Sequence, residues 1–465
     1  MGIPQATDNN HNTGDKTMHN AEVIPKSSNT GALKALTGSL IGLSIFFIPF
    51  AVDGDQSKIP LVSIIDAIKG FLGGGLEYIT LGVTLLLSVT WIASRFSANK
   101  ALKDYHRKDN TVVGFLFLLG AVFAALLVFK VGPDWFLHKD VGGLALYLGG
   151  SVFLTVTVAG FFVLFLTEFG FLEFVGTLME PLMRPLYRLP GRSAVDAVAS
   201  FVAAPAVGIF ITNKLYKSGN YTQREAASIA TNFSICSLGF FALLASIGGI
   251  MEYLPHMIIS SFIINFLLAA VVTRIPPLNN KPDTFFDGRP VQNIEEDRPQ
   301  AGNIVMRACH AASQRASQTG GDVFQKYLWE STTFAQKIVA YILSIATVSL
   351  IIGTYTPVFD YLGVAIEPLI SLLNLPDADK IAPTVLISIA EVALPAIMIS
   401  GGEVAPISVF FVCTLSTVQI IFFTESANAM LESDIPLSVK DLVVIFLIRT
   451  VLAIPLVAAA AHLIF

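Results

Sequence analysis

One carboxylate lies inside an almost wholly apolar stretch of the chain. Glu391 is near the centre of IAPTVLISIAEVALPAIMIS, residues 381–400, and Pro395 follows it four residues later. A charged side chain at the centre of a bilayer costs at least about 2.5–3.5 kcal/mol, so it usually faces a cavity or a partner. Kept from water, it could bind and release a proton at neutral pH. The alternative is a structural role, in which Glu391 accepts hydrogen bonds from main-chain amides that the proline leaves free.

A single arginine lies equally deep in the last apolar segment. Arg449 is in VVIFLIRTVLAIPLV, too far from either end of that segment for its head group to reach water. It therefore needs a partner within the protein. The expected partner is a carboxylate such as Glu391 or Glu403, or else an anionic solute.

Polar side chains at the start of another apolar segment form a second group of candidates. Residues 231–234 read TNFS, which places an amide and hydroxyls close together. These groups suit either a polar solute or a dehydrated sodium ion. The alternative is that they join neighbouring helices by hydrogen bonds.

The remaining polar candidates each have a structural alternative. Glu403 follows two glycines in SGGEVAPIS and is either a ligand or the cap of the next helix. Ser416 and Gln419 are three apart and so share one helix face, which contacts either solute or a neighbouring helix. Asp196 and Ser200 are four apart, and Asp196 is alternatively a helix cap.

The composition shows which elements must position these residues. The chain has 465 residues, of which 54% are hydrophobic and only 14% charged, against about 25% charged in soluble domains. Apolar runs near twenty residues recur, and only helices or closed barrels cross lipid. We therefore expect an all-α, polytopic membrane protein. The three cysteines have no C-x-x-C spacing and no catalytic motif is present, so no enzyme, metal, cofactor or nucleic-acid partner is expected.

The apolar runs predict about nine transmembrane helices. The loop after the second helix is rich in lysine and arginine, so this loop and the N-terminus are expected in the cytoplasm. Residues 59–75 are amphipathic and too short to span, which is typical of an interfacial helix. The expected spans are 33–52, 76–95, 112–131, 143–167, 225–252, 256–273, 336–356, 404–424 and 441–464.

One apolar segment does not fit a crossing. Residues 193–212 are long enough to span, but basic residues flank both ends, so both ends favour the cytoplasm. Pro205 and Gly208 interrupt the segment. We therefore expect a re-entrant hairpin, whose broken backbone must be buried in protein or line a wet cavity.

An internal repeat extends this interpretation to residues 381–400. EFVGTLMEPL (173–182) matches DYLGVAIEPL (360–369), FVAAPA (201–206) matches EVALPA (391–396), and FSICSL (233–238) matches FFVCTL (410–415). Three crossings separate the copies, so the repeats are expected to be inverted, as in many secondary transporters. The second re-entrant hairpin would enter from outside.

These expectations divide the chain into five segments. The segments are a disordered cytoplasmic tail at 1–32, a four-span N-terminal region at 33–167, a first repeat with a cytoplasmic hairpin at 168–275, a polar cytoplasmic loop at 276–334, and a second, inverted repeat with an outer hairpin and the last span at 335–465.

The sequence resembles a known family over the repeats, about residues 168–275 and 335–464. EFVGTLMEPLMRPLYRLPGRSAVDAVASF, followed by ITNKLYKSGNYTQREAASIATNFS, resembles the nucleoside-recognition or Gate domain, and the whole chain is similar to bacterial YjiH-type membrane proteins. Gate domains also occur in spore-maturation membrane proteins and ferrous-iron transporters, and they are similar to the core of concentrative nucleoside transporters. The resemblance implies that polar residues of both hairpins and of the broken helices after them bind a solute. The matching positions are Ser200, Thr231, Asn232, Ser234, Glu391, Ser400, Glu403, Ser416 and Gln419, with Arg449 as a charge partner.

The resemblance and the repeat imply a secondary active transporter of the bacterial inner membrane. It would move a small polar solute, such as a nucleoside, nucleobase or amine, by alternating access coupled to H⁺ or Na⁺. A non-transporting membrane component that docks a partner, and a passive channel, are the alternatives. A homo-oligomer in the lipid bilayer is a further expectation, since nucleoside carriers of this architecture are typically trimers.

Overall fold

Nearly all of the chain that can be described is helical. The computed structural model describes residues 29–48, 50–52, 56–107, 109–290, 303–400 and 404–465. Within these residues the strands β1 (Phe50–Val52) and β2 (Gln56–Lys58) form one short antiparallel ladder. The expected all-α class is therefore confirmed apart from this ladder, which no feature of the sequence predicted.

Seven of the expected spans are present as helical segments, some of them interrupted, that are long and apolar enough to cross a membrane. They are Gly75–Phe96, Thr111–Val128, Asp134–Thr167, Gln223–Ile247, Met251–Val272, Val323–Tyr355 and Val439–Ile464. Two expected spans are shorter. For 33–52, helix α1 (Asn29–Phe47) ends before the β-ladder, and for 404–424, helix α22 (Pro406–Gln419) ends where Ile420 adopts a φ of 65°.

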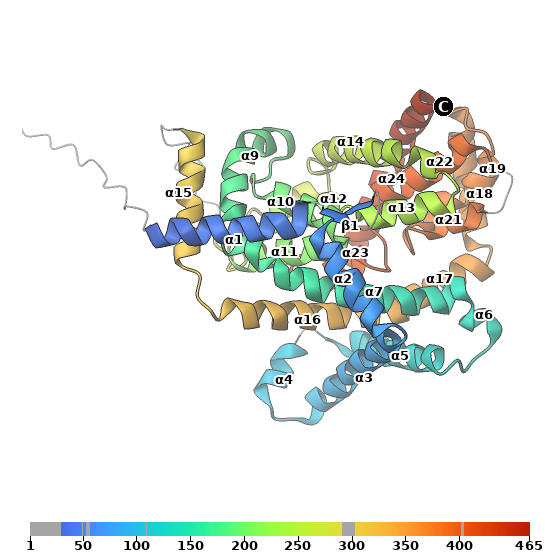
Figure 1. Cartoon of the computed structure of the whole chain (residues 1–465). Coiled ribbons are helices and arrows are strands. Elements are labelled where there is room, and N and C mark those ends of the chain that lie inside the picture. The colour runs from blue at the N-terminus through green and yellow to red at the C-terminus, as the bar shows by residue number, and fades with distance from the viewer. Residues whose placement is uncertain (1–28, 49, 53–55, 108, 291–302, 401–403) are drawn as a thin grey trace, which may run out of the picture.

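The N-terminal spans pack against a long helix from the middle of the chain. That helix is α16 (Val323–Tyr341), which continues through a π-helical turn into α17 (Thr347–Tyr355) and packs against α3 (Gly75–Phe96), α5 (Thr111–Val128) and α7 (Leu144–Phe162). Figure 1 shows α7 and α16 side by side across the molecule, with α3 and α5 beneath them. Small residues permit the close approach, because a Cβ at Gly120 would lie 2.6 Å from the carbonyl oxygen of Ala340.

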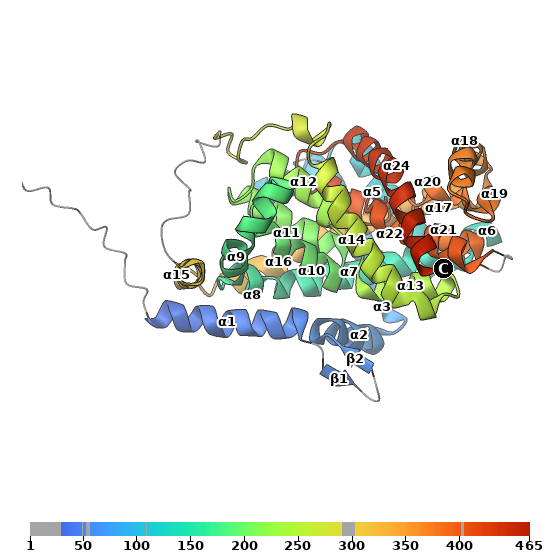
Figure 2. The ribbon, with the colours of Figure 1, turned by 90° about the horizontal axis from the view of Figure 1, so that it is seen from above.

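The segment 276–334, which was expected to be a polar loop, contains helical residues. Helix α15 (Ile304–Ser317) lies within it, and α16 begins at Val323. Ala308, Ala312 and Ala316 recur every fourth residue and are buried, so one face of an otherwise polar helix packs against α1 and α9 (Phe171–Tyr187). The amphipathic stretch 59–75 is a helix as expected, α2 (Pro60–Leu72), and Figure 2 shows α1 and α2 along one edge of the molecule.

The rest of the chain forms two sets of helices, which we call the first half (residues 171–272) and the second half (residues 358–464). The first half contains α9 (Phe171–Tyr187), α10 (Ser193–Val202), α11 (Pro205–Lys217), α12 (Gln223–Phe233), α13 (Leu238–Ile247) and α14 (Leu254–Val272). The second half contains α18 (Val358–Leu372), α19 (Ala378–Ile381), α20 (Thr384–Ile387), α21 (Leu394–Ile399), α22 (Pro406–Gln419), α23 (Ser426–Glu432) and α24 (Val439–Ile464).

Both halves begin with a helix whose glycine meets the start of the next segment. A Cβ at Gly176 would lie 3.1 Å from the Cα of Arg192, the residue before α10. A Cβ at Gly363 would lie 2.7 Å from the main-chain nitrogen of Pro383, the residue before α20. The two glycines that were matched in the sequence therefore both permit a close contact with a later segment, although α19 intervenes only in the second half.

Candidate functional site

The chain breaks between α10 and α11, in the segment expected to be the first hairpin, and we keep the name first hairpin for residues 193–217. Ala203 and Ala204 separate the two helices, and Pro205 opens α11 at a position that needs no amide donor. The two arms pack closely, because a Cβ at Gly208 would lie 1.8 Å from Ser200 Oγ. Ser200 is fully buried and donates to the carbonyl oxygen of Asp196 at 3.0 Å, so its hydroxyl contributes to the packing of the arms.

Asp196 joins the arms of this hairpin to the helix that follows. Its Oδ2 accepts hydrogen bonds from Tyr221 Oη at 2.9 Å and from Thr212 Oγ1 at 3.3 Å. The N-cap position of α10 is Arg192, so the alternative role of Asp196 as a helix cap is wrong. Its buried side chain instead holds α10, α11 and the turn before α12 together.

The segment expected to be the second hairpin, residues 378–400, keeps the name second hairpin. It is broken over a longer stretch, and Glu391 lies in the break. The break separates α20 from α21, and the Glu391 side chain is buried. Its Oε1 accepts a hydrogen bond from the Ala393 amide at 3.0 Å, and the Thr424 hydroxyl lies beside the carboxyl without good hydrogen-bond geometry toward Oε2. Ser400 ends α21 and donates to the Ile397 carbonyl at 2.7 Å, and Glu403 falls outside the described residues.

The helices after the two hairpins are broken as well. Helix α12 ends at Phe233 and α13 begins at Leu238, while α22 ends at Gln419 and α23 begins at Ser426. The matching of FSICSL (233–238) with FFVCTL (410–415) is therefore wrong in register, because the first lies at a break and the second inside a continuous helix. The break in the second half lies instead at residues 420–425.

Glu425, at the end of the second break, is the functional candidate that sequence reasoning missed. Its Oε1 accepts a hydrogen bond from the amide of Ala206 at 2.9 Å, at the tip of the first hairpin. Its carboxyl interacts electrostatically with that of Glu391. The signal was an acid in the apolar run IIFFTES, but the expected span ended at residue 424 and left it outside.

All four breaks converge on this pair of carboxyls. Cys236, from the break between α12 and α13, lies close enough to interact electrostatically with both Glu391 and Glu425. Thr424 lies beside Glu391. We call these residues, with the Ala206 amide, the carboxyl cluster. Among the described residues no group of three or more metal-binding side chains occurs.

A second buried network surrounds Arg449, next to the ends of α12 and α22. Its guanidinium donates to Asn232 Oδ1 and Asn265 Oδ1, both at 2.7 Å, and to the carbonyl oxygen of Val418 at 2.6 Å. Among the residues that the structure describes, the partners of Arg449 are thus neutral oxygens, whereas a carboxylate was expected.

Gln419 connects this region to the second hairpin. Its Nε2 donates to the Val385 carbonyl and to Thr450 Oγ1, both at 2.8 Å, and its Oε1 accepts from Ser388. Of the other predicted residues, Thr231 and Ser416 donate to carbonyls of their own helices. Ser234 is buried at the C-cap of α12. The structure therefore brings Asn232 to Arg449 and Gln419 to the second hairpin, while Ser200 and Ser400 have local contacts.

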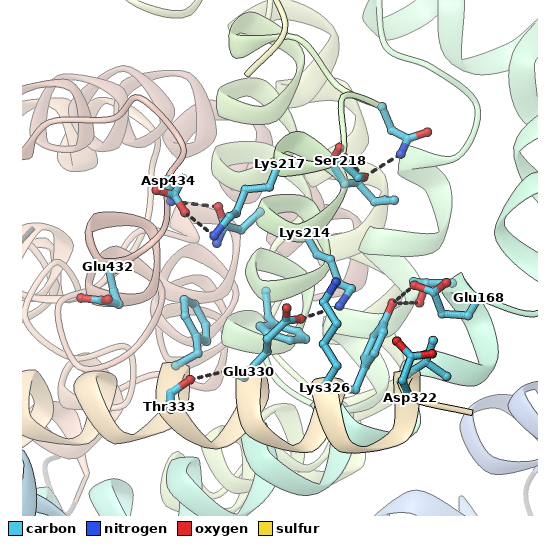
Figure 3. A pocket seen from close by; sticks show the side chains of 18 of the residues that line it. Glu168, Lys214, Lys217, Ser218, Asp322, Lys326, Glu330, Thr333, Glu432 and Asp434 are labelled. Atoms are coloured by element: carbon cyan, nitrogen blue, oxygen red, sulfur yellow. Dashed lines mark hydrogen bonds and ion pairs between the residues drawn. The ribbon is translucent and has the colours of Figure 1, made fainter. Parts of the chain in front are cut away.

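A charged pocket of about 690 Å³ lies beside α11, at the end of the molecule predicted to be cytoplasmic. Figure 3 shows Lys214 and Lys217 directed into it, opposite Glu330 and Asp434 respectively, with which they form ion pairs. Phe210 and Phe334 also line it, with ring centroids 5.5 Å apart. None of the residues predicted from the sequence lines this pocket. Since Phe210 is one helical turn beyond Ala206 on α11, the pocket and the carboxyl cluster share that helix.

Comparison with known proteins identifies the family. Residues 150–251 match the Gate family, described as nucleoside recognition, and this range includes the first hairpin and the break after it. An uncharacterized protein of Alkalihalophilus pseudofirmus is 34% identical over 447 residues, covering 94% of this chain and 95% of that protein. The sporulation integral membrane protein YlbJ of Bacillus subtilis is 33% identical over 92 residues, 17% of this chain and 22% of YlbJ. The chain therefore belongs, with the Alkalihalophilus protein, to a family of multi-pass membrane proteins that carry a Gate nucleoside-recognition domain.

Proposed function

We propose that this protein carries a small polar solute across the membrane by alternating access, coupled to a cation gradient. The observation that carries the proposal is the convergence of four broken segments on two carboxyls, that of Glu391, which is buried, and that of Glu425, which is half-buried. Broken helices leave main-chain groups without helical partners, and inside a membrane these groups are tolerated where they face protein or a binding cavity. Buried acids among them are suited to bind a solute or a proton.

The packing of the two halves supports an inverted repeat. Helix α11 of the first hairpin packs against α23, the helix after the second break, while α21 of the second hairpin packs against α13, the helix after the first break. Each hairpin thus contacts the broken helix of the other half. Two hairpins that enter from opposite faces and meet in this way allow one hairpin to open while the other stays closed.

The boundaries of the proposed working parts follow from this arrangement. The repeats extend over residues 168–275 and 335–465, with one hairpin facing each side of the membrane. The four-span region at 33–167 packs against α16 and serves as a support.

The solute is proposed to be neutral or cationic, and of the size of a nucleoside, nucleobase or amine. The carboxyl groups and main-chain amides of the carboxyl cluster offer hydrogen bonds to such molecules. The Gate family description, nucleoside recognition, supports the same class. The similarity to YlbJ, whose name refers to sporulation, favours one competing function, that of a membrane component that docks a partner without transport.

Solute binding and uptake test the proposal. The purified protein would be screened by thermal shift against nucleosides, nucleobases and amines, and each stabilising solute then offered to proteoliposomes in radiolabelled form. We expect saturable uptake, and we expect Glu391→Gln to reduce it about tenfold or more, the effect of losing about 1.4 kcal/mol or more of transition-state stabilisation. The matched control is Glu77→Gln, at an exposed acid of α3, which should leave uptake unchanged.

Two results would contradict the proposal. Uptake that is unaffected by Glu391→Gln would remove the role of that residue. A screen in which no solute raises the melting temperature, while another membrane protein co-purifies, would favour the docking function instead.

A further inference from the structure

The guanidinium of Arg449 lies between the C-terminal ends of two half-helices. Asn232 is in the last turn of α12, which ends at Phe233, and Val418 is in the last turn of α22, which ends at Gln419. The Val418 carbonyl has lost its usual helical partner, because the amide four residues later, that of Phe422, is bonded to Ser426 Oγ. Arg449 itself is fully buried and comes from α24.

This position attracts a cation for two reasons. The C-terminal end of a helix carries a partial negative charge, and here two such ends meet. The oxygens that face the site are two side-chain amide oxygens and one main-chain carbonyl, from Asn232, Asn265 and Val418. In transporters with broken helices, half-helix ends and unwound carbonyls of this kind coordinate sodium.

The arrangement of the site is fitted to a cation and does more than join helices. Asn265 turns its oxygen to Arg449, and its Nδ2 is left without a hydrogen-bond partner among the described residues. An unpaired buried donor costs about 1–3 kcal/mol, which an uncharged side chain in place of the arginine would not offset. Because the guanidinium is charged at every physiological pH, the cation at this place is permanent.

We propose that Arg449 is a tethered cation that fills the place of a coupling sodium ion, so that this protein works without sodium. The statement about coupling rests on the proposed transport function. The exclusion of sodium from this site does not rest on it. Protons on Glu391 and Glu425 then remain as the coupling charges. The groups that face these carboxyls are the amides of Ala393 and Ala206, the Thr424 hydroxyl and the Cys236 thiol.

Sodium binding by the unaltered protein is the first test. Melting temperatures would be compared in sodium chloride and choline chloride at equal ionic strength, and ²²Na⁺ binding would be measured by scintillation proximity. We expect the same melting temperature in both salts and no saturable ²²Na⁺ binding. Saturable binding, or stabilisation that grows with sodium concentration as binding to the folded state requires, would overturn the proposal.

Removal of the tethered cation is the second test. Arg449→Ala leaves a cavity walled by the three oxygens, so we expect this variant to melt lower and to be restored by sodium or by millimolar guanidinium, but not by choline. Arg449→Lys keeps a cation in place and should stay indifferent to sodium. A folded Arg449→Ala variant that neither ion restores would overturn the proposal, and if that variant fails to fold, ²²Na⁺ binding to the unaltered protein decides.

The transport function and this inference fail in different ways. If no solute is taken up in any ion gradient, the transport function fails, while the sodium measurements on purified protein still decide the role of Arg449. If uptake is present and requires sodium, the transport function holds and the inference about Arg449 is overturned.

Discussion

The two hairpins differ in what lies at their breaks. In the first, arms of 10 and 13 residues flank a short break, and the nearby acid Asp196 accepts hydrogen bonds from two hydroxyls. In the second, the helices are only 4, 4 and 6 residues long, and Glu391 lies in the break itself and accepts a hydrogen bond from a main-chain amide. Asp196 and Glu391 are alike in that each has one carboxyl oxygen without a partner among the described residues.

Within the proposed transport function, this difference suits the two hairpins to different tasks. Short helices keep few of their own hydrogen bonds, so the second hairpin is the less costly one to rearrange. The first hairpin is the more regular body, and it presents the Ala206 amide to Glu425. We infer that the first hairpin positions the carboxyl cluster. The second hairpin supplies Glu391, the group that changes its charge.

Neutralising the acid of each hairpin is the strongest way to break this comparison. Asp196→Asn keeps acceptors for Tyr221 and Thr212, so we expect uptake close to that of the unaltered protein and a somewhat lower melting temperature. Glu391→Gln should show the reverse, with uptake lowered about tenfold or more and folding retained. Uptake in proteoliposomes and thermal unfolding, measured on both variants, check this. Equal losses of uptake would show that the hairpins do not divide the work.

Adding one methyl group where α18 contacts the second hairpin is expected to have the next largest effect, a loss of stability. Gly363→Ala would place a Cβ 2.7 Å from a main-chain atom of Pro383, and overpacking of this kind costs about 1–3 kcal/mol. Gly82→Ala on α3 is the matched control, because a Cβ there meets nothing within 4 Å, and alanine in a helix stabilises by about 0.5–1 kcal/mol relative to glycine. Unfolding titrations of the two variants should therefore move in opposite directions.

A buried ion cluster also joins the second half to the N-terminal spans. Neutralising one of its acids is expected to have the smallest effect of the three changes. Lys337 lies 3.1 Å from Asp109 Oδ1 and 3.0 Å from Glu432 Oε1, at the end of α23, and His106 Nδ1 lies 2.7 Å from Asp109 Oδ2. Burial alone would raise the pKa of the Asp109 carboxyl, but the hydrogen bond from His106 and the charge of Lys337 outweigh it and hold this pKa below its usual value.

The pH dependence follows from that sign. A carboxyl with a lowered pKa in the folded state stabilises the fold above its unfolded pKa, about 3.9, and this stabilisation is lost as the pH falls through the folded value. We expect the stability advantage of the unaltered protein over Asp109→Asn to be constant near neutral pH and to shrink below about pH 4. An advantage that grows on acidification would show that the cluster does not hold Asp109 charged.

Much of this architecture could be predicted from the sequence, and particular residues explain where prediction failed. The long apolar runs predicted seven spans because their length alone suffices. The end of α22 could not be predicted, because no glycine or proline marks Ile420, whose positive φ depends on its surroundings. The same misjudged end left Glu425 outside the expected span, and α15 was missed because its buried alanines lie among polar residues. The partners of Arg449 come from three other helices, and no local pattern indicates such contacts.

The central claim is that two broken segments enter the membrane from opposite faces, and cysteine accessibility tests it most directly. Single cysteines at the exposed positions Arg188 and Ser218 would flank the first hairpin, and those at Asn374 and Ser400 the second, in a protein whose exposed Cys309 is replaced by serine. An impermeant maleimide applied to each side of intact and inverted membranes should label the first pair only from the cytoplasm and the second pair only from outside. Labelling of the two ends of either hairpin from opposite sides would contradict the account.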